Sequence, residues 1–536
     1  MLSYRKLAMR VLGRPFHTGR IDSPRPASQR AAAFILTAAM LTTLAAPAFA
    51  DIWHIENGDI TISAGESGNN VTQNNNTTYG DTNTIITNQN KDTASSHTVT
   101  IEAKDKDDKV EVTLKDVNID TSSRNKAAVS VTGEGDTNIK LDGDNALKSD
   151  IYRSGIYGSG SGSLTISGGE NDSLTAQGGS GANGISSSGS LTISGGTVTA
   201  NGDDGGRGIS SSGSVTISGG STVTANGGSG TISGGDGIWS GGGVTISGGS
   251  TVTANGGNGG SLVGGDGIRS GGGLTVSDGT VTAKGGNGDS KDGYGGDGIR
   301  SGGVVTISGN TVNASGGYGG KVGGYGICSF DRVAISGGTV EAAGGNGSTG
   351  GGSGIYSSVI DLSGSLELTA KAGSPTGKAL LQNGRELDLD TIKDKLGPGA
   401  KVTATDANGE TKQVSTPRPV EPEESSSSSD GGSAAPSAPA SPLPGLTVTD
   451  KDGQRISYTS TQSGNTLTVC VGRFTASFRI SLAALRQLRA EGIETITFQT
   501  VLCSTTLSVD ELLAMGGEDA EAVLTHRFTD SSLTVG

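Results

Sequence analysis

The chain has 536 residues, 94 of them glycine, a net charge of −14 and only 4% aromatic residues. This acidity argues against binding to nucleic acid or to anionic lipid surfaces, and it favours solubility and cation binding. The three cysteines, Cys328, Cys470 and Cys503, cannot all pair within one chain, so no disulfide framework is expected.

Residues 1–50 have the organisation of a signal peptide. Basic residues are spread over the first thirty positions, and an apolar stretch follows at 31–46. A small-x-small cleavage signature then precedes Asp51. The apolar stretch is short for a membrane span, and we expect no span elsewhere in the chain. The sequence therefore predicts a secreted, extracellular protein, either free or associated with the cell surface.

Residues 51–150 contain short runs in which apolar and polar residues alternate, a pattern typical of β-strands. The runs lie at 60–62, 98–101, 110–114, 129–131 and 139–141. They are more polar than the sequence that follows, and we expect them to form the irregular first coils of a solenoid. A solenoid end needs a cap over its open core, for which Trp53 and Ile55 are candidates.

One phrase then recurs eight times. It reads Leu-Thr-Ile-Ser-Gly-Gly, Thr-Val-Thr-Ala, a glycine loop and Gly-Ile, and it returns every 24 to 31 residues. The aliphatic residue that opens it falls at Leu164, Leu191, Val215, Val244, Leu274, Val305, Val333 and Ile360. Three short strands in a repeat of this length predict the regular coils of a parallel β-helix over residues 151–415.

The isoleucine after each glycine loop is expected to form an inward column. Its members are Ile185, Ile209, Ile238, Ile268, Ile299, Ile327 and Ile355. We expect the glycines mainly at the corners of the coils, where the backbone needs a positive φ. The strict aliphatic period argues against the alternative, a disordered chain rich in glycine and serine.

Residues 416–445 are rich in Pro, Ser, Ala and Glu, which indicates a semi-extended linker. Residues 446–536 predict a small α+β domain, in which Cys470 and Cys503 either pair or stay free. Strands are expected at 446–448, 467–469 and 495–498, and helices at 482–490, capped by Ser481, and at 509–515. Nothing in this domain indicates a chemistry, and its partner at the cell surface is unknown.

Three carboxylates occupy the same position in successive repeats. The phrase Gly-Gly-Asp-Gly-Ile places Asp236, Asp266 and Asp297 in one column. Carboxylates stacked about 5 Å apart repel one another unless a proton or a cation intervenes. Calcium is the natural bridge, because it takes oxygen ligands in irregular geometry. The alternative is that each aspartate points to water and bonds the backbone of its own turn.

The residue that follows each inward isoleucine is expected to point outward, because side chains alternate along a strand. This exterior column contains Tyr157, Ser186, Ser210, Trp239, Arg269, Arg300, Cys328 and Tyr356. An aromatic ring on a polar sheet is suited to stacking on a sugar, and arginine to pairing with hydroxyls or acidic sugars. We therefore take Tyr157, Trp239, Arg269, Arg300 and Tyr356 as candidate ligand-binding residues. The alternative is that the exposed aromatics are incidental.

The phrase Leu-Thr-Ile-Ser-Gly-Gly-Thr-Val-Thr-Ala with Gly-Gly-Asp-Gly-Ile resembles secreted bacterial proteins described as carbohydrate-binding domain-containing. Residues 110–121 and 139–145 resemble the start of that domain, and the resemblance covers roughly 51–375. It implies a right-handed parallel β-helix, similar to that of polysaccharide lyases, that binds plant-type polysaccharides without established catalysis and can bind calcium. Only the aspartate of Gly-Gly-Asp-Gly-Ile carries over as an individual residue.

The function we expect is non-catalytic binding of a polysaccharide, acidic ones included. One alternative is a polysaccharide lyase, which uses calcium and a basic residue to take a proton beside a sugar carboxylate. Asp266 with Arg269, and Asp297 with Arg300, supply these residue types, but their duplication indicates drift of a repeat. Another alternative is a surface adhesin whose rod spaces the C-terminal domain from the cell.

Overall fold

The computed structural model describes residues 51–417 and, further on, 445–449, 455–456, 458–463, 465–471, 475–500, 504–515, 520–526 and 531–535. The expected signal peptide, nearly all of the expected linker and Cys503 lie outside these residues. The chain divides into two units at Pro419 and Val420. In the described parts, no helix combines the length and the apolar character that crossing a membrane requires.

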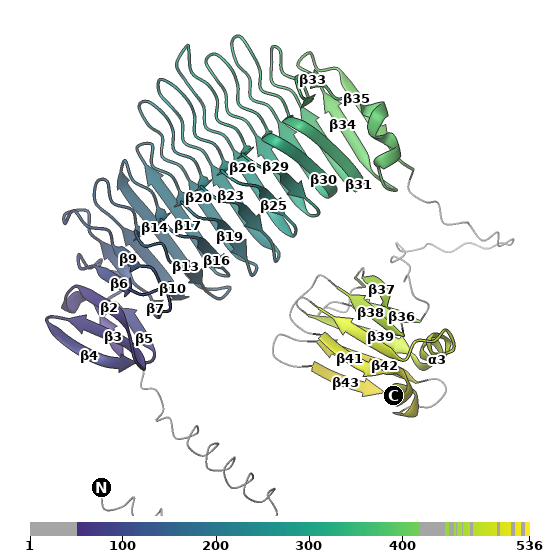
Figure 1. Ribbon diagram of the computed structural model, residues 1–536, viewed down its shortest axis with the longest axis horizontal. Coiled ribbons are helices and arrows are strands. Elements are labelled where there is room, and N and C mark those ends of the chain that lie inside the picture. Colours follow the sequence, from purple (N-terminus) through teal and green to yellow (C-terminus); the bar gives the residue numbers. More distant parts are fainter. Residues whose placement is uncertain are drawn as a thin grey trace, which may run out of the picture. The chain divides into compact units, whose positions relative to one another are not determined.

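The first unit is a parallel β-solenoid of about 13 turns, as predicted (Figure 1). Its regular coils each contribute one strand to each of three columns of hydrogen-bonded parallel strands. The first column, whose regular strands begin with the inward isoleucine, contains β2 (Ile60–Gly65), β6 (Val99–Ala103), β9 (Val129–Gly133), β12 (Ile156–Gly158), β15 (Ile185–Ser187), β18 (Ile209–Ser211), β21 (Ile238–Ser240), β24 (Ile268–Ser270) and β27 (Ile299–Ser301).

The other two columns follow the same order along the solenoid. The second column contains β1 (Ile52–His54), β5 (Thr84–Thr87), β7 (Lys109–Lys115), β10 (Asp136–Asp142), β13 (Leu164–Ser167), β16 (Leu191–Ser194), β19 (Val215–Ser218), β22 (Val244–Ile246), β25 (Leu274–Val276) and β28 (Val305–Ile307). The third column contains β8 (Asn118–Asp120), β11 (Asp144–Lys148), β14 (Ser173–Ser180), β17 (Thr197–Asp203), β20 (Thr222–Asn226), β23 (Ser250–Asn255), β26 (Gly279–Lys284) and β29 (Thr311–Ser315).

Near the C-terminal end of the solenoid, two strands run through all three columns. They are β30 (Ile327–Ala343) and β31 (Ile355–Lys371). The end itself is built from β32 (Leu380–Gln382), β33 (Arg385–Glu386), the 3-10 helix η2 (Leu389–Lys395), β34 (Lys401–Thr405) and β35 (Thr411–Ser415).

The N-terminal end is covered by an antiparallel hairpin and a short helix. The hairpin strands β3 (Gly68–Gln73) and β4 (Asn76–Asp81) extend the sheet from β2. Ile55, in the 3-10 helix η1 (Ile55–Asn57), is fully buried in the core, and Trp53 packs against that core while its indole N–H donates to Asp81 over 3.1 Å. The predicted plug residues therefore lie at the end of the core as expected, with the hairpin as an additional cover.

The inward columns form the core. Every isoleucine of the predicted column, from Ile185 to Ile355, is fully buried. Burial of such β-branched side chains on consecutive coils stabilises a solenoid whose coils contact only their neighbours.

The expectation that the glycines lie mainly at corners with a positive φ is wrong for most of them. Only 21 of the described glycines have a positive φ, and the loops that join the third column to the first are built largely from others. A Cβ on Gly286 would lie 2.0 Å from the carbonyl oxygen of Gly257, and one on Gly256 would lie 1.9 Å from that of Gly265. The projecting loops are therefore glycine-rich because their backbones touch, not because most of them turn a corner (Figure 1).

These contacts form one continuous series of hydrogen bonds between backbones. Gly265 donates its N–H to Gly257 over 2.8 Å within one loop, and Gly286 donates to Gly265 over 2.8 Å between neighbouring loops. The same pattern recurs in the following coils, for example from Gly296 to Gly286 and from Gly317 to Gly296. The loops are thus ordered extensions of the solenoid, and they hold the start of the first column in place.

A partly exposed ion cluster ties the first coils together. The carboxylate of Asp59 accepts from Arg124 over 2.7 Å and from Lys126 over 2.9 Å, and it contacts the ring of His97. Partial burial alone raises the pKa of Asp59, but the hydrogen bonds from Arg124 and Lys126 outweigh it and hold this pKa well below its usual range. The cluster therefore stabilises the N-terminal coils in the ionised form of Asp59.

We expect Asp59→Asn to destabilise these coils by about 1–2 kcal/mol at neutral pH, allowing for solvent screening. Because the pKa of Asp59 is lowered on folding, the difference from wild type should persist above pH 3.8 and shrink as the pH falls further. Hydrogen exchange of the backbone amides in β2 and β6 measures this loss of stability. Glu111→Gln, at a carboxylate paired only with Lys140 and Asn138, is the control. Equal protection in the two variants would contradict this role for the cluster.

In its described residues, the second unit contains two four-stranded sheets and two helices. The strands are β36 (Leu446–Thr449), β37 (Thr459–Ser463), β38 (Thr466–Cys470), β39 (Ala476–Ser481), β40 (Thr495–Gln499), β41 (Ser504–Ser508), β42 (Glu521–His526) and β43 (Ser531–Val535). The helices α3 (Leu482–Ala490) and α4 (Val509–Met515) match the predicted ranges. Ser481 caps α3 as predicted, since its hydroxyl accepts from the amide of Ala484 over 3.2 Å.

Candidate functional site

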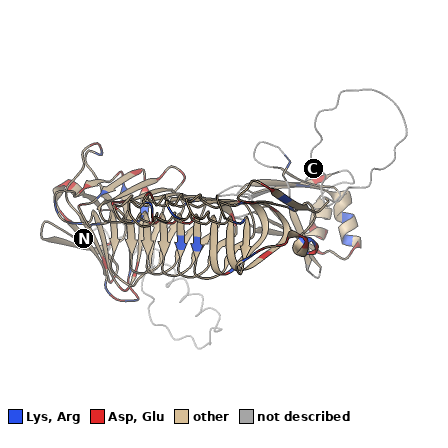
Figure 2. Ribbon diagram, turned by 90° about the horizontal axis from the view of Figure 1, so that it is seen from above, with Lys and Arg blue, Asp and Glu red and all other residues tan. Residues whose placement is uncertain are grey.

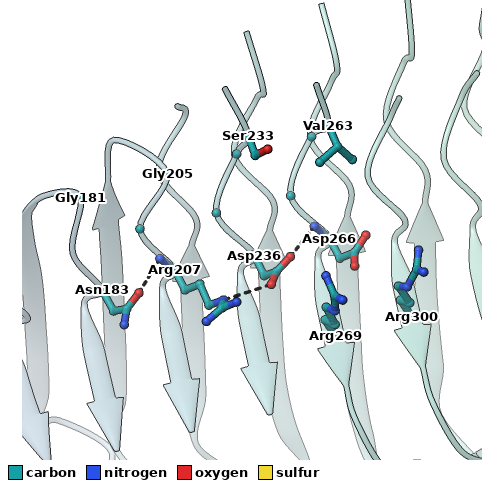
Figure 3. A pocket seen from close by; sticks show the side chains of 15 residues that line it. Gly181, Asn183, Gly205, Arg207, Ser233, Asp236, Val263, Asp266, Arg269 and Arg300 are labelled. Carbon is teal, nitrogen blue, oxygen red and sulfur yellow. Dashed lines mark hydrogen bonds and ion pairs between the residues drawn. The ribbon is translucent and has the colours of Figure 1, made fainter. Parts of the chain in front are cut away.

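A cavity of about 500 Å³ lies on the solenoid where the glycine loops enter the first column. Arg207, Asp236, Asp266, Arg269 and Arg300 line it with loop glycines (Figure 3). These charged side chains come from four successive coils, and loop glycines of these coils line the cavity beside them. Figure 2 shows that the middle of the solenoid carries few charges elsewhere on its strands, so this cluster stands out.

The aspartates form a row of side-chain-to-backbone hydrogen bonds that joins successive coils. Asp236 accepts from the amide of Asp266 over 2.9 Å, and Asp266 accepts from the amide of Asp297 over 2.7 Å. Asp297 in turn accepts from Tyr325 over 2.7 Å. The row begins earlier with Asn183, which accepts from the amide of Arg207 over 2.8 Å. We call this set of residues the aspartate row.

The three aspartates are therefore in line, as the repeat predicted, but they do not point to water or bond their own turns. All three are more than 90% buried. Each uses one oxygen to accept an amide of the next coil, an amide that would otherwise be left without an acceptor in the loop. The sequence could not show this, because the bond joins residues about 30 positions apart.

The second carboxylate oxygens differ in their partners. Arg207 donates to Oδ2 of Asp236 over 3.2 Å, and Arg300 donates to Oδ2 of Asp297 over 3.3 Å. Among the described residues, Oδ2 of Asp266 has no hydrogen bond or ion pair, and neither has the exposed guanidinium of Arg269. The middle of the site therefore contains one unpaired carboxylate oxygen and one unpaired cation.

Burial determines the charge of the row. The pKa of Asp266 is raised well above its ordinary value. Burial is the largest cause, and the charges of Asp297 and Asp236 follow. Burial also raises the pKa of Asp297 to about 6, although the amide of Tyr325 and the charge of Arg300 oppose it. The two carboxyls titrate as a pair, and the row retains a proton closer to neutral pH than free aspartates do.

The geometry does not fit the calcium site that the sequence suggested. One oxygen of each aspartate already accepts a hydrogen bond from a backbone amide, and guanidinium groups occupy two of the remaining oxygens. Among the described residues, no three acidic, histidine or cysteine side chains are arranged to hold a metal ion. In this arrangement the guanidinium groups of Arg207 and Arg300 neutralise two of the carboxylates, and calcium binding stays a prediction that these contacts do not favour.

The exterior column has the predicted register. Trp239 pairs with Arg269, Arg269 with Arg300, and Tyr356 follows Arg300 two coils later. Tyr157 lies three coils before Trp239, so neither tyrosine reaches the cavity. Of the five candidate ligand-binding residues, only Arg269 and Arg300 line it.

Trp239 offers a sugar at most one open face of its ring. The guanidinium of Arg207 lies over its ring at 4.4 Å, which covers one face of the indole. Tyr356 is likewise stacked on Tyr325, with ring centroids 5.1 Å apart. Trp239 and Tyr356 thus pack against neighbouring side chains, while Tyr157 is 44% exposed but lies away from the cavity. At the cavity, the unpaired charge among the described residues is that of Arg269.

Sequence reasoning missed Arg207. It occupies the position of the aspartate row in the coil before Asp236, where it contacts both Asp236 and Trp239. The signal was present in the repeat: Arg207 stands two residues before the inward isoleucine, where the next three coils have aspartate. A cation at a position followed by carboxylates predicts an ion pair between neighbouring coils.

Comparison of the chain with known protein families, curated proteins and solved structures finds no match. The solenoid agrees with the fold that the sequence resemblance implied, while the carbohydrate ligand remains a prediction.

Proposed function

We propose that the solenoid is a non-catalytic binding module for an acidic polysaccharide, which it holds at the cavity beside β24 and β27. The observation that carries this proposal is the unpaired guanidinium of Arg269, exposed at the mouth of a cavity whose other two arginines are already paired. Arginine binds a carboxylate through two parallel hydrogen bonds, which gives both affinity and orientation.

The surroundings support a chain-like ligand. The cavity is open on an outer face, and the coils repeat about 4.8 Å apart, so a polysaccharide can continue along neighbouring coils. Catalysis is not part of the proposal, because a lyase base must be free to accept a proton. Arg300 does not meet this condition, because its guanidinium stays protonated. Burial lowers the pKa of Arg300, but the charges of Asp297 and Asp266 outweigh burial and raise this pKa.

Affinity electrophoresis of the full chain tests the proposal. In gels that contain polygalacturonate we expect retardation, with none in gels that contain neutral dextran. Arg269→Ser should weaken binding by about 1.5–3 kcal/mol, the range for a hydrogen bond to a charged group. Arg332→Ser is the matched control, since Arg332 is also an exposed arginine of the solenoid but lies away from the cavity. Equal retardation of the two variants would exclude the cavity as the binding site.

A further inference from the structure

Asp266 differs from the other two aspartates of the row. It is 6% exposed, it lies between two carboxylates, and its Oδ2 atom lacks a partner within the described residues. Figure 3 shows its carboxyl group among the side chains that line the cavity, which include Arg269 and Arg300. Because this oxygen faces the cavity, a ligand that enters the cavity can form a hydrogen bond with it.

The charges around Asp266 decide which ligand fits. Asp236 and Asp297 face it from the neighbouring coils, and each is paired with an arginine. Arg269 comes from its own strand, and the buried, protonated thiol of Cys328 and the phenol of Tyr325 lie further along, next to Arg300 and Asp297. With all three aspartates ionised the net charge of the site is zero, so the site attracts an anion less strongly. With Asp266 protonated, the charge of Arg269 is left for the ligand.

We propose that the cavity takes up one proton together with each carboxylate-bearing sugar that it binds. This rests on the proposed function. The ligand carboxylate accepts from the guanidinium of Arg269 through one oxygen and from the carboxyl O–H of Asp266 through the other. The proton remains on Asp266, so no covalent bond changes. The raised pKa of Asp266 in the unliganded protein supports this assignment, because little free energy is needed to place the proton there.

The sign of the pH dependence follows from linkage. Because the bound state holds the proton more tightly, affinity rises as the pH falls, until the sugar carboxylate itself becomes protonated. Above the folded-state pKa of Asp266, affinity should fall by about tenfold per pH unit, the limit for uptake of one proton.

Isothermal titration of the full chain with an oligogalacturonate, from pH 5.5 to 8.5 and in buffers with different heats of ionisation, measures both affinity and proton uptake. Above the folded-state pKa of Asp266, wild type should bind more weakly at each step up in pH and take up close to one proton. Below that pKa the carboxyl group already holds its proton, so uptake should vanish and affinity should level off. Asp266→Asn should bind with an affinity that is independent of pH, because its amide is a permanent donor to the carboxylate. Asparagine fits this position, since Asn183 already occupies the equivalent place and accepts from Arg207.

Two further variants make the result specific. Asp297→Asn removes a neighbouring negative charge and should shift the pH dependence of binding to lower pH without abolishing it. Glu111→Gln, outside the cavity, should leave the profile of wild type unchanged. An identical pH dependence in wild type and Asp266→Asn, or binding of wild type without proton uptake at pH 8.5, would overturn the inference while leaving the proposed function intact. No binding of any of these proteins at any pH would instead contradict the proposed function.

Discussion

Ile268→Asp should unfold the central coils of the solenoid or lower its free energy of unfolding by about 5 kcal/mol. This loss lies at the upper end of the range for single substitutions. Ile268 is fully buried, and an aspartate there would place a charge in a narrow apolar interior that offers it no partner. The loss should spread to neighbouring coils, because each coil is stabilised by contacts with the next.

Urea denaturation followed by tryptophan fluorescence measures this effect near the substitution. Trp239 lies on the adjacent strand of the first column, and it is one of only two tryptophans in the chain. Thr280→Asp is the control, because Thr280 is exposed on β26, where the same charge faces water. A denaturation midpoint for Ile268→Asp equal to that of Thr280→Asp would show that the inward phase of β24 is wrong.

Gly286→Ala should destabilise the solenoid by about 3 kcal/mol, the upper part of the range for overpacked sites. A Cβ at this position would lie 2.0 Å from the carbonyl oxygen of Gly257 and 2.5 Å from its carbon. Backbone atoms have no alternative rotamer, so the two loops must separate. Separation also breaks the hydrogen bond from Gly286 to Gly265.

Gly350→Ala provides the comparison within the same set of loops. Its Cβ would meet only side-chain atoms at 3.5 Å or more, which is ordinary contact. Thermal melting followed by circular dichroism should show a clear loss for Gly286→Ala and almost none for Gly350→Ala. Similar melting temperatures would indicate that the loops separate at little cost and that the glycine contacts do not stabilise the fold.

The solenoid was predictable because its determinants are local and periodic. Alternation in Leu-Thr-Ile and Thr-Val-Thr-Ala fixes which residues point inward, and the inward isoleucines from Ile185 to Ile355 are all buried. Ser481 likewise predicted the start of α3 from its capping chemistry alone.

The close approach of the loops and the pairing at the site were not predictable in this way. A glycine that permits a positive φ and a glycine that permits two backbones to touch look the same in a sequence, so Gly265 and Gly286 were assigned the wrong role. The site depends on bonds between neighbouring coils, such as Arg207 to Asp236 and Asp266 to the amide of Asp297. The repeat places these residues in line on neighbouring coils, but it does not show which of their atoms form hydrogen bonds.

The most direct test of acidic-polysaccharide binding is a crystal structure of the full chain, or of a fragment first shown to fold alone, grown with an oligogalacturonate below pH 6. The account predicts a sugar in the cavity beside β24, with its carboxylate in contact with both the guanidinium of Arg269 and the carboxyl of Asp266. A sugar bound on another face of the solenoid, with the cavity free of it, would contradict the account.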